Sequence, residues 1–153
     1  MREAAVGAGS QEPGAGKIES FRDLRVWQAG MDLVEDVYRT TEEFPVSATY
    51  GLTSQMRRAA VSIPSNIAEG HSRESTREYL QHLSVAQGSL AELETQLELA
   101  LRLRYLATKT ANDHTLQIHS LGRQLFRLRD AISRKLKPAP GSRPLAPDAK
   151  ALC

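Results

Sequence analysis

The sequence predicts an all-α protein whose ordered part is one four-helix bundle. Its 153 residues are the size of a single domain, and Ala, Leu, Glu and Arg, which favour helices, are abundant. Apolar residues recur at intervals of three and four along four separate segments, and no segment alternates as a strand does. Short connections between long helices favour antiparallel neighbours, so the expected arrangement is up-down-up-down.

The first two helices are expected on either side of Pro45, which marks a connection. The first carries two apolar stripes, one with Leu24, Trp27, Met31, Val34 and Tyr38, the other with Val26, Leu33 and Val37. The second is expected from about residue 47 to Gly70, which fits a C-terminal cap. One face of it carries Leu52, Met56, Ala59, Ile63 and Ile67.

The third helix is expected to begin at a capping box formed by Ser75 and Glu78 and to end near Leu106. The turn "TKTAND" separates it from the fourth helix. The apolar residues of the fourth helix are Ile118, Leu121, Leu125, Leu128 and Ile132.

Pro64 lies inside the second helical segment, where it removes an N–H donor and conflicts with the carbonyl of Ala60. The apolar spacing continues through it, which predicts a kinked helix rather than a new helix capped by Ser62. Asn66 lies four residues after Ser62 on the same face. Either side chain is expected to hydrogen-bond backbone near the proline.

The two ends differ in composition from the bundle, which is expected over residues 21–137. Residues 1–20 are rich in Gly, Ala and Ser and predict a disordered leader, while residues 138–153 are Pro-rich and predict a disordered tail. No apolar run is long enough to cross a bilayer, and no signal peptide precedes the bundle, so a cytoplasmic protein is expected. The single cysteine, Cys153, excludes an internal disulfide.

Motifs for catalysis and metal binding are missing from the sequence. The Glu-x-x-His pairs of a di-iron bundle, zinc-ligand spacings and a phosphate-binding glycine loop do not occur. We therefore expect a protein that is not an enzyme, with no catalytic residue, no metal and no cofactor.

Positive charge is concentrated in the last quarter of the chain. Residues 1–116 hold twelve Lys/Arg and sixteen Asp/Glu, whereas residues 117–153 hold eight and two. This basic quarter is either a solvated surface or a phosphate-binding one. The candidate nucleic-acid contacts are Arg57, Arg58, Arg123, Arg127, Arg134, Lys135 and Lys137. Few aromatic residues are present, which argues against a dedicated reader of single strands.

The role of Arg57 and Arg58 stays open among three alternatives. They pair with carboxylates of the third helix, such as Glu92 or Glu94, or bond helix ends; they contact another subunit; or they grip phosphate oxygens. Apolar residues on more than one face of the first and third helices favour an intermolecular surface. Gly88, inside the third helix, suggests close approach of another backbone, for instance that of the second helix.

Three segments, "FRDLRVWQAGMDLVEDVYRTTEEFP", "YGLTSQMRRAAVSIPSNIAEG" and "STREYLQHLSVAQGSLAELETQL", resemble a family of bacterial four-helix-bundle proteins. The family includes the protein encoded in the intervening sequence of 23S ribosomal RNA genes. The resemblance covers about residues 21–106. It implies a ring-shaped homopentamer without catalytic residues. The positions assigned to fold and assembly are Trp27, Tyr38, Pro64, Asn66, Glu69, Gly88, Ser89 and Glu92.

A related branch of that family comprises accessory proteins of diversity-generating retroelements, which work with a reverse transcriptase and its template RNA. Three functions therefore remain open for this chain. The first is an oligomeric scaffold that binds nucleic acid, with RNA favoured over DNA. The second is a retroelement accessory protein that binds a reverse transcriptase, and the third is a scaffold with protein partners alone.

Overall fold

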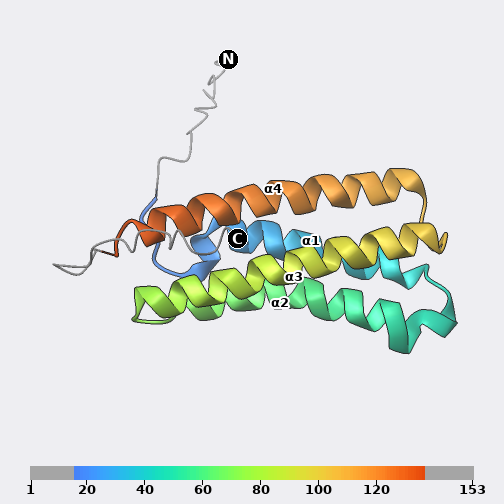
Figure 1. Cartoon of the computed structure of the whole chain (residues 1–153), viewed down its shortest axis with the longest axis horizontal. Coiled ribbons are helices and arrows are strands. Elements are labelled where there is room, and N and C mark those ends of the chain that lie inside the picture. Colours follow the sequence, from blue (N-terminus) through green and yellow to red (C-terminus); the bar gives the residue numbers. More distant parts are fainter. Residues whose placement is uncertain (1–15, 137–153) are drawn as a thin grey trace, which may run out of the picture.

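The computed structural model describes residues 16–136, and four long helices account for most of them. They are α1 (Arg25–Glu42), α2 (Ser54–His71), α3 (Thr76–Arg102) and α4 (Thr108–Ser133). No strand occurs in the described residues. The helices lie side by side, and the chain colours change in opposite directions along consecutive helices (Figure 1). The predicted all-α four-helix bundle is confirmed, whereas most of the predicted leader and the tail lie outside the described residues.

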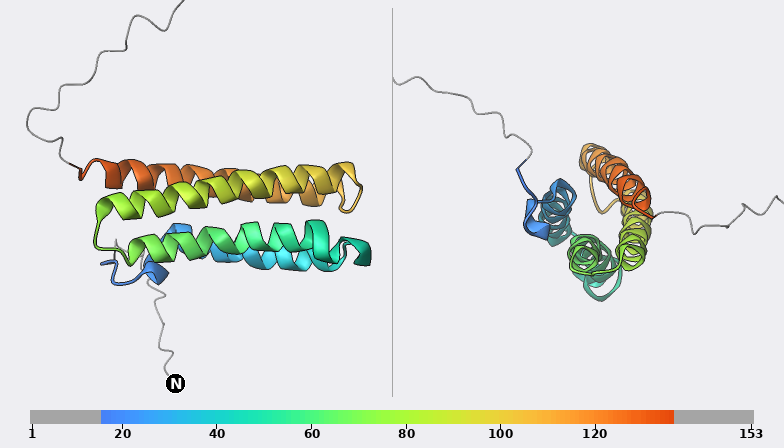
Figure 2. Two further views of the ribbon diagram at one scale, coloured as in Figure 1. Left: turned by 60° about the horizontal axis from the view of Figure 1, so that its bottom comes forward. Right: turned by 90° about the vertical axis from the view of Figure 1, so that its left-hand side faces the viewer.

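The helices are arranged in chain order around an arc, with α2 between α1 and α3 (Figure 2). The contact of α2 with α3 is the most extensive, and that of α1 with α4 is the smallest of the four contacts between neighbouring helices. The core fills the inside of the arc. Its fully buried large side chains are Leu33, Met56, Ile63, Ile67, Leu83, Leu93, Leu121 and Leu125. Each contributes about 1.5–3 kcal/mol by its burial.

The two predicted stripes of α1 are buried to different extents. Val26, Leu33 and Val37 are buried, whereas the side chains of Met31 and Tyr38 are 38% and 41% exposed. A short turn of 3-10 helix, η1 (Phe21–Asp23), precedes α1 and is capped reciprocally by Ser20 and Asp23. Leu24 of the second stripe is also buried, and Trp27 and Val34 are partly buried against the core. Only Met31 and Tyr38 of that stripe remain as exposed apolar surface.

The start of the second helix was predicted too early, at about residue 47. A 3-10 turn, η2 (Val46–Ala48), and a π-helical turn, η3 (Thr49–Thr53), come before α2. The interruption lies at Gly51, whose dihedrals (φ −108°, ψ −112°) are not helical. As a result Tyr50 stands outside the bundle with 98% of its side chain exposed.

Helix α2 continues through Pro64 to His71, as the apolar spacing predicted. The Asn66 side-chain amide donates to the Ser62 carbonyl (2.8 Å) and to the Ser62 hydroxyl (3.1 Å). On the α1 side, a Cβ added at Gly30 would lie 3.4 Å from Cβ of Pro64. The missing side chain at Gly30, which the sequence analysis did not single out, lets α1 approach the proline ring.

The predicted roles of two glycines are wrong. Gly70 is not a cap, because α2 extends to His71; instead Gly70 packs against α3, where an added Cβ would lie 2.7 Å from Cβ of His82. Gly88 does not approach α2, since no atom lies within 4 Å of a Cβ built on it. The neighbouring Ser89 does face α2, and its hydroxyl lies 2.8 Å from that of Ser62.

The ends of α3 differ slightly from the prediction. The Ser75 hydroxyl accepts the N–H of Glu78 at 3.4 Å and caps the N-terminus, which is the serine half of the predicted capping box. The helix ends at Arg102 rather than near Leu106, because Arg104 takes the left-handed conformation (φ 60°) and reverses the chain.

We expect Gly70→Ala to lower the free energy of unfolding by about 1–3 kcal/mol, because the new methyl group meets His82 and the Tyr79 ring. This outweighs the gain of about 1 kcal/mol from alanine's helix propensity. The matched variant Gly88→Ala adds a methyl group in open space and should stabilise the folded subunit by up to about 1 kcal/mol. Urea unfolding at one protein concentration measures both. Equal effects of the two substitutions would contradict the packing seen at Gly70.

Burial at the α2–α3 contact raises the pKa of Tyr79 to about 12, from its ordinary value near 10. The folded protein then holds the tyrosine proton to higher pH than the unfolded chain. The free energy of unfolding should therefore be unaffected by Tyr79 below about pH 10 and should fall as the pH rises toward 12. In Tyr79→Phe this fall should be smaller, as measured by urea unfolding at several alkaline pH values. Parallel curves for both proteins would contradict the prediction.

Candidate nucleic-acid interface

Hydrogen bonds between α1 and α4 fix which parts of the two helices lie together. The Thr40 hydroxyl lies 2.7 Å from Nε2 of His114, and the Gln117 amide donates to the Asp36 carboxylate at 2.6 Å. The C-terminal half of α4 consequently lies beside the start of α1. This places the arginines of α4 near Arg25.

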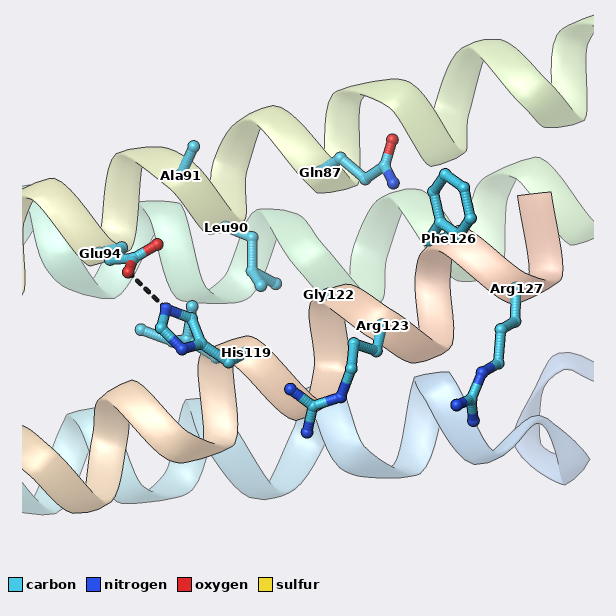
Figure 3. A pocket seen from close by; sticks show the side chains of 10 residues that line it. Gln87, Leu90, Ala91, Glu94, His119, Gly122, Arg123, Phe126 and Arg127 are labelled. Atoms are coloured by element: carbon cyan, nitrogen blue, oxygen red, sulfur yellow. Dashed lines mark hydrogen bonds and ion pairs between the residues drawn. The ribbon is translucent and has the colours of Figure 1, made fainter. Parts of the chain in front are cut away.

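A groove of about 820 Å³ lies between the start of α1 and the C-terminal half of α4. Arg25 and Asp32 line it from α1, and Arg123 and Arg127 line it from α4. The guanidinium groups of Arg123 and Arg127 point to the same side of α4, away from Phe126 (Figure 3). None of the three arginines forms an ion pair with another described residue. We call this the α1–α4 groove.

The remaining predicted basic residues of the C-terminal quarter contribute less to the α1–α4 groove. Arg134 pairs with Asp130 at 2.8 Å. Lys135 is exposed just past the end of α4, and Lys137 lies outside the described residues. Arg129 donates to the Gln87 amide oxygen at 2.8 Å and so joins α4 to α3.

A second groove, of about 640 Å³, lies between α3 and α4 (Figure 3). Leu90, Gly122 and Phe126, which is 67% exposed, line it. Arg123 and Arg127 line it too, so these two arginines border both grooves. The Glu94 carboxylate pairs with Nε2 of His119 at 2.7 Å. Glu94 is therefore bound to α4 and not to an arginine of α2, which the sequence analysis had allowed.

Arg57 and Arg58 occupy different environments, although they are adjacent. Arg57 Nε donates to the Thr41 hydroxyl at 2.9 Å, and its guanidinium carbon lies 4.5 Å from the centre of the Tyr38 ring. Arg57 thus ties α2 to the last turns of α1, which agrees with the alternative in which an arginine bonds a helix end. It forms no ion pair with Glu92 or Glu94. Arg58 is exposed and forms no hydrogen bond or ion pair with any residue in 16–136.

The α2–α3 contact contains a chain of polar groups that joins several of the predicted fold residues. The Asn66 amide oxygen lies 3.2 Å from Nδ1 of His82, and Ser62 bonds to both Asn66 and Ser89. These part-buried hydrogen bonds fix how the two helices align. The predicted fold and assembly residues Glu69 and Glu92 are exposed. Glu69 accepts from Arg73, just past the end of α2, and Glu92 accepts from Gln96 within α3.

Two further structural findings concern possible sites and membrane contact. Within residues 16–136, no three His, Cys, Asp or Glu side chains gather as a metal site requires. No helix of that same region is long and apolar enough to span a lipid bilayer.

Residues 22–127 match the model of a protein family described as 23S rRNA-intervening sequence protein. The chain belongs to this family. The match confirms the resemblance inferred from the sequence and extends it through most of α4, including Arg123 and Arg127.

The fold of the bundle also occurs in a known crystal structure. A protein of unknown function from the S23 ribosomal protein family of Bacteroides thetaiotaomicron superimposes with a TM-score of 0.61 and is 19% identical. The match covers 68% of this chain and 97% of that one. At this identity the likeness shows the fold alone. No curated protein matches the chain.

Sequence reasoning missed Arg25 as a member of the basic groove. Arg25 and Arg127 are far apart in the chain and become neighbours only because α4 returns along α1. The available signal was the predicted reversal of direction between helices, which places the last turns of the fourth helix beside the first turn of the first.

We expect Arg57→Ala to lower the free energy of unfolding by about 1–2 kcal/mol, because it removes the bond to Thr41 and the contact with the Tyr38 ring. Arg58→Ala is the matched control and should change stability by less than about 0.5 kcal/mol. Urea unfolding of both variants tests this. If Arg58→Ala is the more destabilising substitution, the assignment of Arg57 as the structural arginine is wrong.

Proposed function

We propose that this protein is a homo-oligomeric scaffold that binds nucleic acid, with RNA as the preferred partner, through the α1–α4 groove. The observation that carries the proposal is the set of three arginines without ion-pair partners that line one groove of a member of the 23S rRNA-intervening sequence protein family. An rRNA partner also implies a cytoplasmic location. The proposed role is binding, and no residue is assigned to catalysis.

The chemistry of the groove suits a phosphate backbone. A guanidinium group donates two parallel hydrogen bonds to phosphate oxygens, and an arginine without a carboxylate partner keeps its charge available. Arg123 and Arg127 lie one helical turn apart, so they offer successive contacts along one direction. Asp32 at the groove opposes part of this charge. Contacts of this kind position RNA without reading its sequence.

The apolar surface that the bundle leaves exposed supports self-assembly. Met31 on α1 and Val85 and Leu99 on α3 are exposed, as is Leu103 just past the end of α3. Exposed large apolar side chains that the fold does not bury favour contacts between proteins. We propose that antiparallel up-down-up-down bundles join through these two faces into a homopentameric ring. Contact between two different faces closes into a ring when the rotation permits.

A glycine at position 88 has no packing role within the described part of one subunit, but it would have one at a contact between subunits. It lies on the exposed side of α3, with no described atom near the position of a side chain. A helix of another subunit could approach there closely because no Cβ stands in the way. A ring would also repeat the α1–α4 groove in every subunit, which strengthens the electrostatic field that attracts RNA.

We expect the logarithm of RNA affinity to fall linearly with the logarithm of salt concentration while the oligomer remains intact. Substitution of Arg25, Arg123 or Arg127 by Ala should each reduce the slope by about 1 for every subunit in contact with the RNA. The measurement is a salt titration of a short hairpin RNA, with particle mass recorded by light scattering in each buffer.

The matched control for these variants is Arg102→Ala. It removes the same charge, but Arg102 lies at the end of α3 and pairs with Glu98 at 2.9 Å. It should leave the slope unchanged. An intact oligomer that ignores RNA even at low salt would contradict the proposal and would direct attention to protein partners, such as a reverse transcriptase.

A further inference from the structure

Two of the four tyrosines in the chain line one groove, at the opposite end of α1 from the basic α1–α4 groove. This groove, of about 550 Å³, lies where the end of α1 meets η3 and the first turns of α2. Tyr38, Tyr50, Arg57 and Arg58 line it together with several hydroxyl groups, and no described carboxylate does. We call it the tyrosine groove. The small number of aromatic residues, which argued against single-strand binding, conceals this local concentration.

The Arg57 guanidinium group lies over the Tyr38 ring in the tyrosine groove. The guanidinium carbon lies 4.5 Å from the centre of the Tyr38 ring, and the Nε bond to Thr41 holds the group there. An ordered guanidinium plane and an aromatic ring are the two kinds of surface on which nucleobases stack. Because the bond to Thr41 already holds the guanidinium group, little side-chain entropy of Arg57 is lost when a base binds.

Tyr50 supplies a second aromatic ring that the fold itself does not use. Its side chain is 98% exposed, and it makes no ring contact or side-chain hydrogen bond with any residue in 16–136. Its place outside the bundle follows from the interruption of the helix at Gly51. A large aromatic residue that is exposed beside a groove gains by burying its ring against a ligand.

Arg58 completes the set with a free positive charge. It lines the tyrosine groove, is exposed, and has no ion-pair partner within the described residues. The hydroxyls of Thr49 and Ser54 lie in the same groove as further donors. The site therefore offers aromatic surface and a guanidinium group together. A nucleotide combines the complementary features, a planar base and a negative phosphate.

We infer that the tyrosine groove binds one unpaired nucleotide of an RNA strand, with the base stacked on Tyr50 and on the Tyr38–Arg57 pair and the phosphate bound by Arg58. The base must be unpaired, because the bases of a duplex are stacked on one another and expose only their edges. The inference deepens the proposed RNA binding and rests on it. At 1.5 Å per residue the α1 segment from Arg25 to Tyr38 spans about 20 Å, so the two grooves are separate and can be altered independently.

The test uses the full-length oligomer and two RNAs, a short single strand that contains the fluorescent base 2-aminopurine and a blunt duplex of the same length. Tyr50→Ala should bind the single strand about 5- to 100-fold more weakly and lose the fluorescence quenching caused by stacking. Tyr50→Phe keeps the ring and should bind within about 3-fold of the wild type. Arg58→Ala should weaken binding but retain the quenching. Duplex binding should be the same in all four proteins.

Several outcomes would overturn the inference, and they differ from those that would overturn the proposed function. If Tyr50→Ala binds and quenches like the wild type while Arg127→Ala weakens binding, the tyrosine groove is not a base site but the α1–α4 groove stands. If Tyr50→Ala changes the particle mass, Tyr50 belongs to a contact between proteins. Dependence on Tyr50 without dependence on Arg127 would support the tyrosine groove alone. If the wild type binds neither RNA at low salt, both the inference about the tyrosine groove and the proposed RNA-binding function are wrong.

Discussion

The close packing of α2 against α1 and α3 at the same time is the constraint on which the rest of the bundle depends. On one side the ring of Pro64 lies against Gly30, and on the other Gly70 lies against Tyr79 and His82. At each contact a glycine removes the side chain that would hold the helices apart. Close approach then allows short side chains to bond across the α2–α3 contact, as Ser62 does with Ser89. Tight packing thus brings α2 and α3 together, and hydrogen bonds across their contact set how the two helices align.

The contact between α1 and α4 is built differently, and this difference explains the position of the basic groove. Its described cross-links are polar, with Thr40 at His114 and Asp36 at Gln117, and its packing is the least extensive between neighbouring helices. A shallow contact leaves room for long side chains at its open end. An arginine there keeps its charged group in water while its stem covers apolar surface. Three arginines without ion-pair partners among the described residues therefore lie at the α1–α4 contact, where neighbouring helices pack least extensively.

Sequence patterns predicted the elements well but not which surface of each element is used. The spacing of Leu, Ile and Val predicted four helices and the continuation of α2 through Pro64. It could not predict which residues of the two stripes of α1 stay exposed, because both stripes are apolar and only the position of the neighbouring helices leaves Met31 and Tyr38 uncovered. The same limit explains the errors at Gly70 and Gly88. Both interrupt a helical pattern in sequence, but one meets another helix and the other meets no described atom.

The basic residues show a second limit of the sequence, since a count of charges is not a count of charges available to a ligand. Successive residues of a helix are about 100° apart, so Arg57 and Arg58 cannot face the same way. Arg57 is held by α1, and Arg134 is paired within one turn of its own chain, while Arg25 acquires a role only through its neighbours on α4. A salt dependence of RNA binding responds to the free groups alone. The slope would therefore count the arginines that the fold leaves free to contact phosphate, a number that the composition does not give.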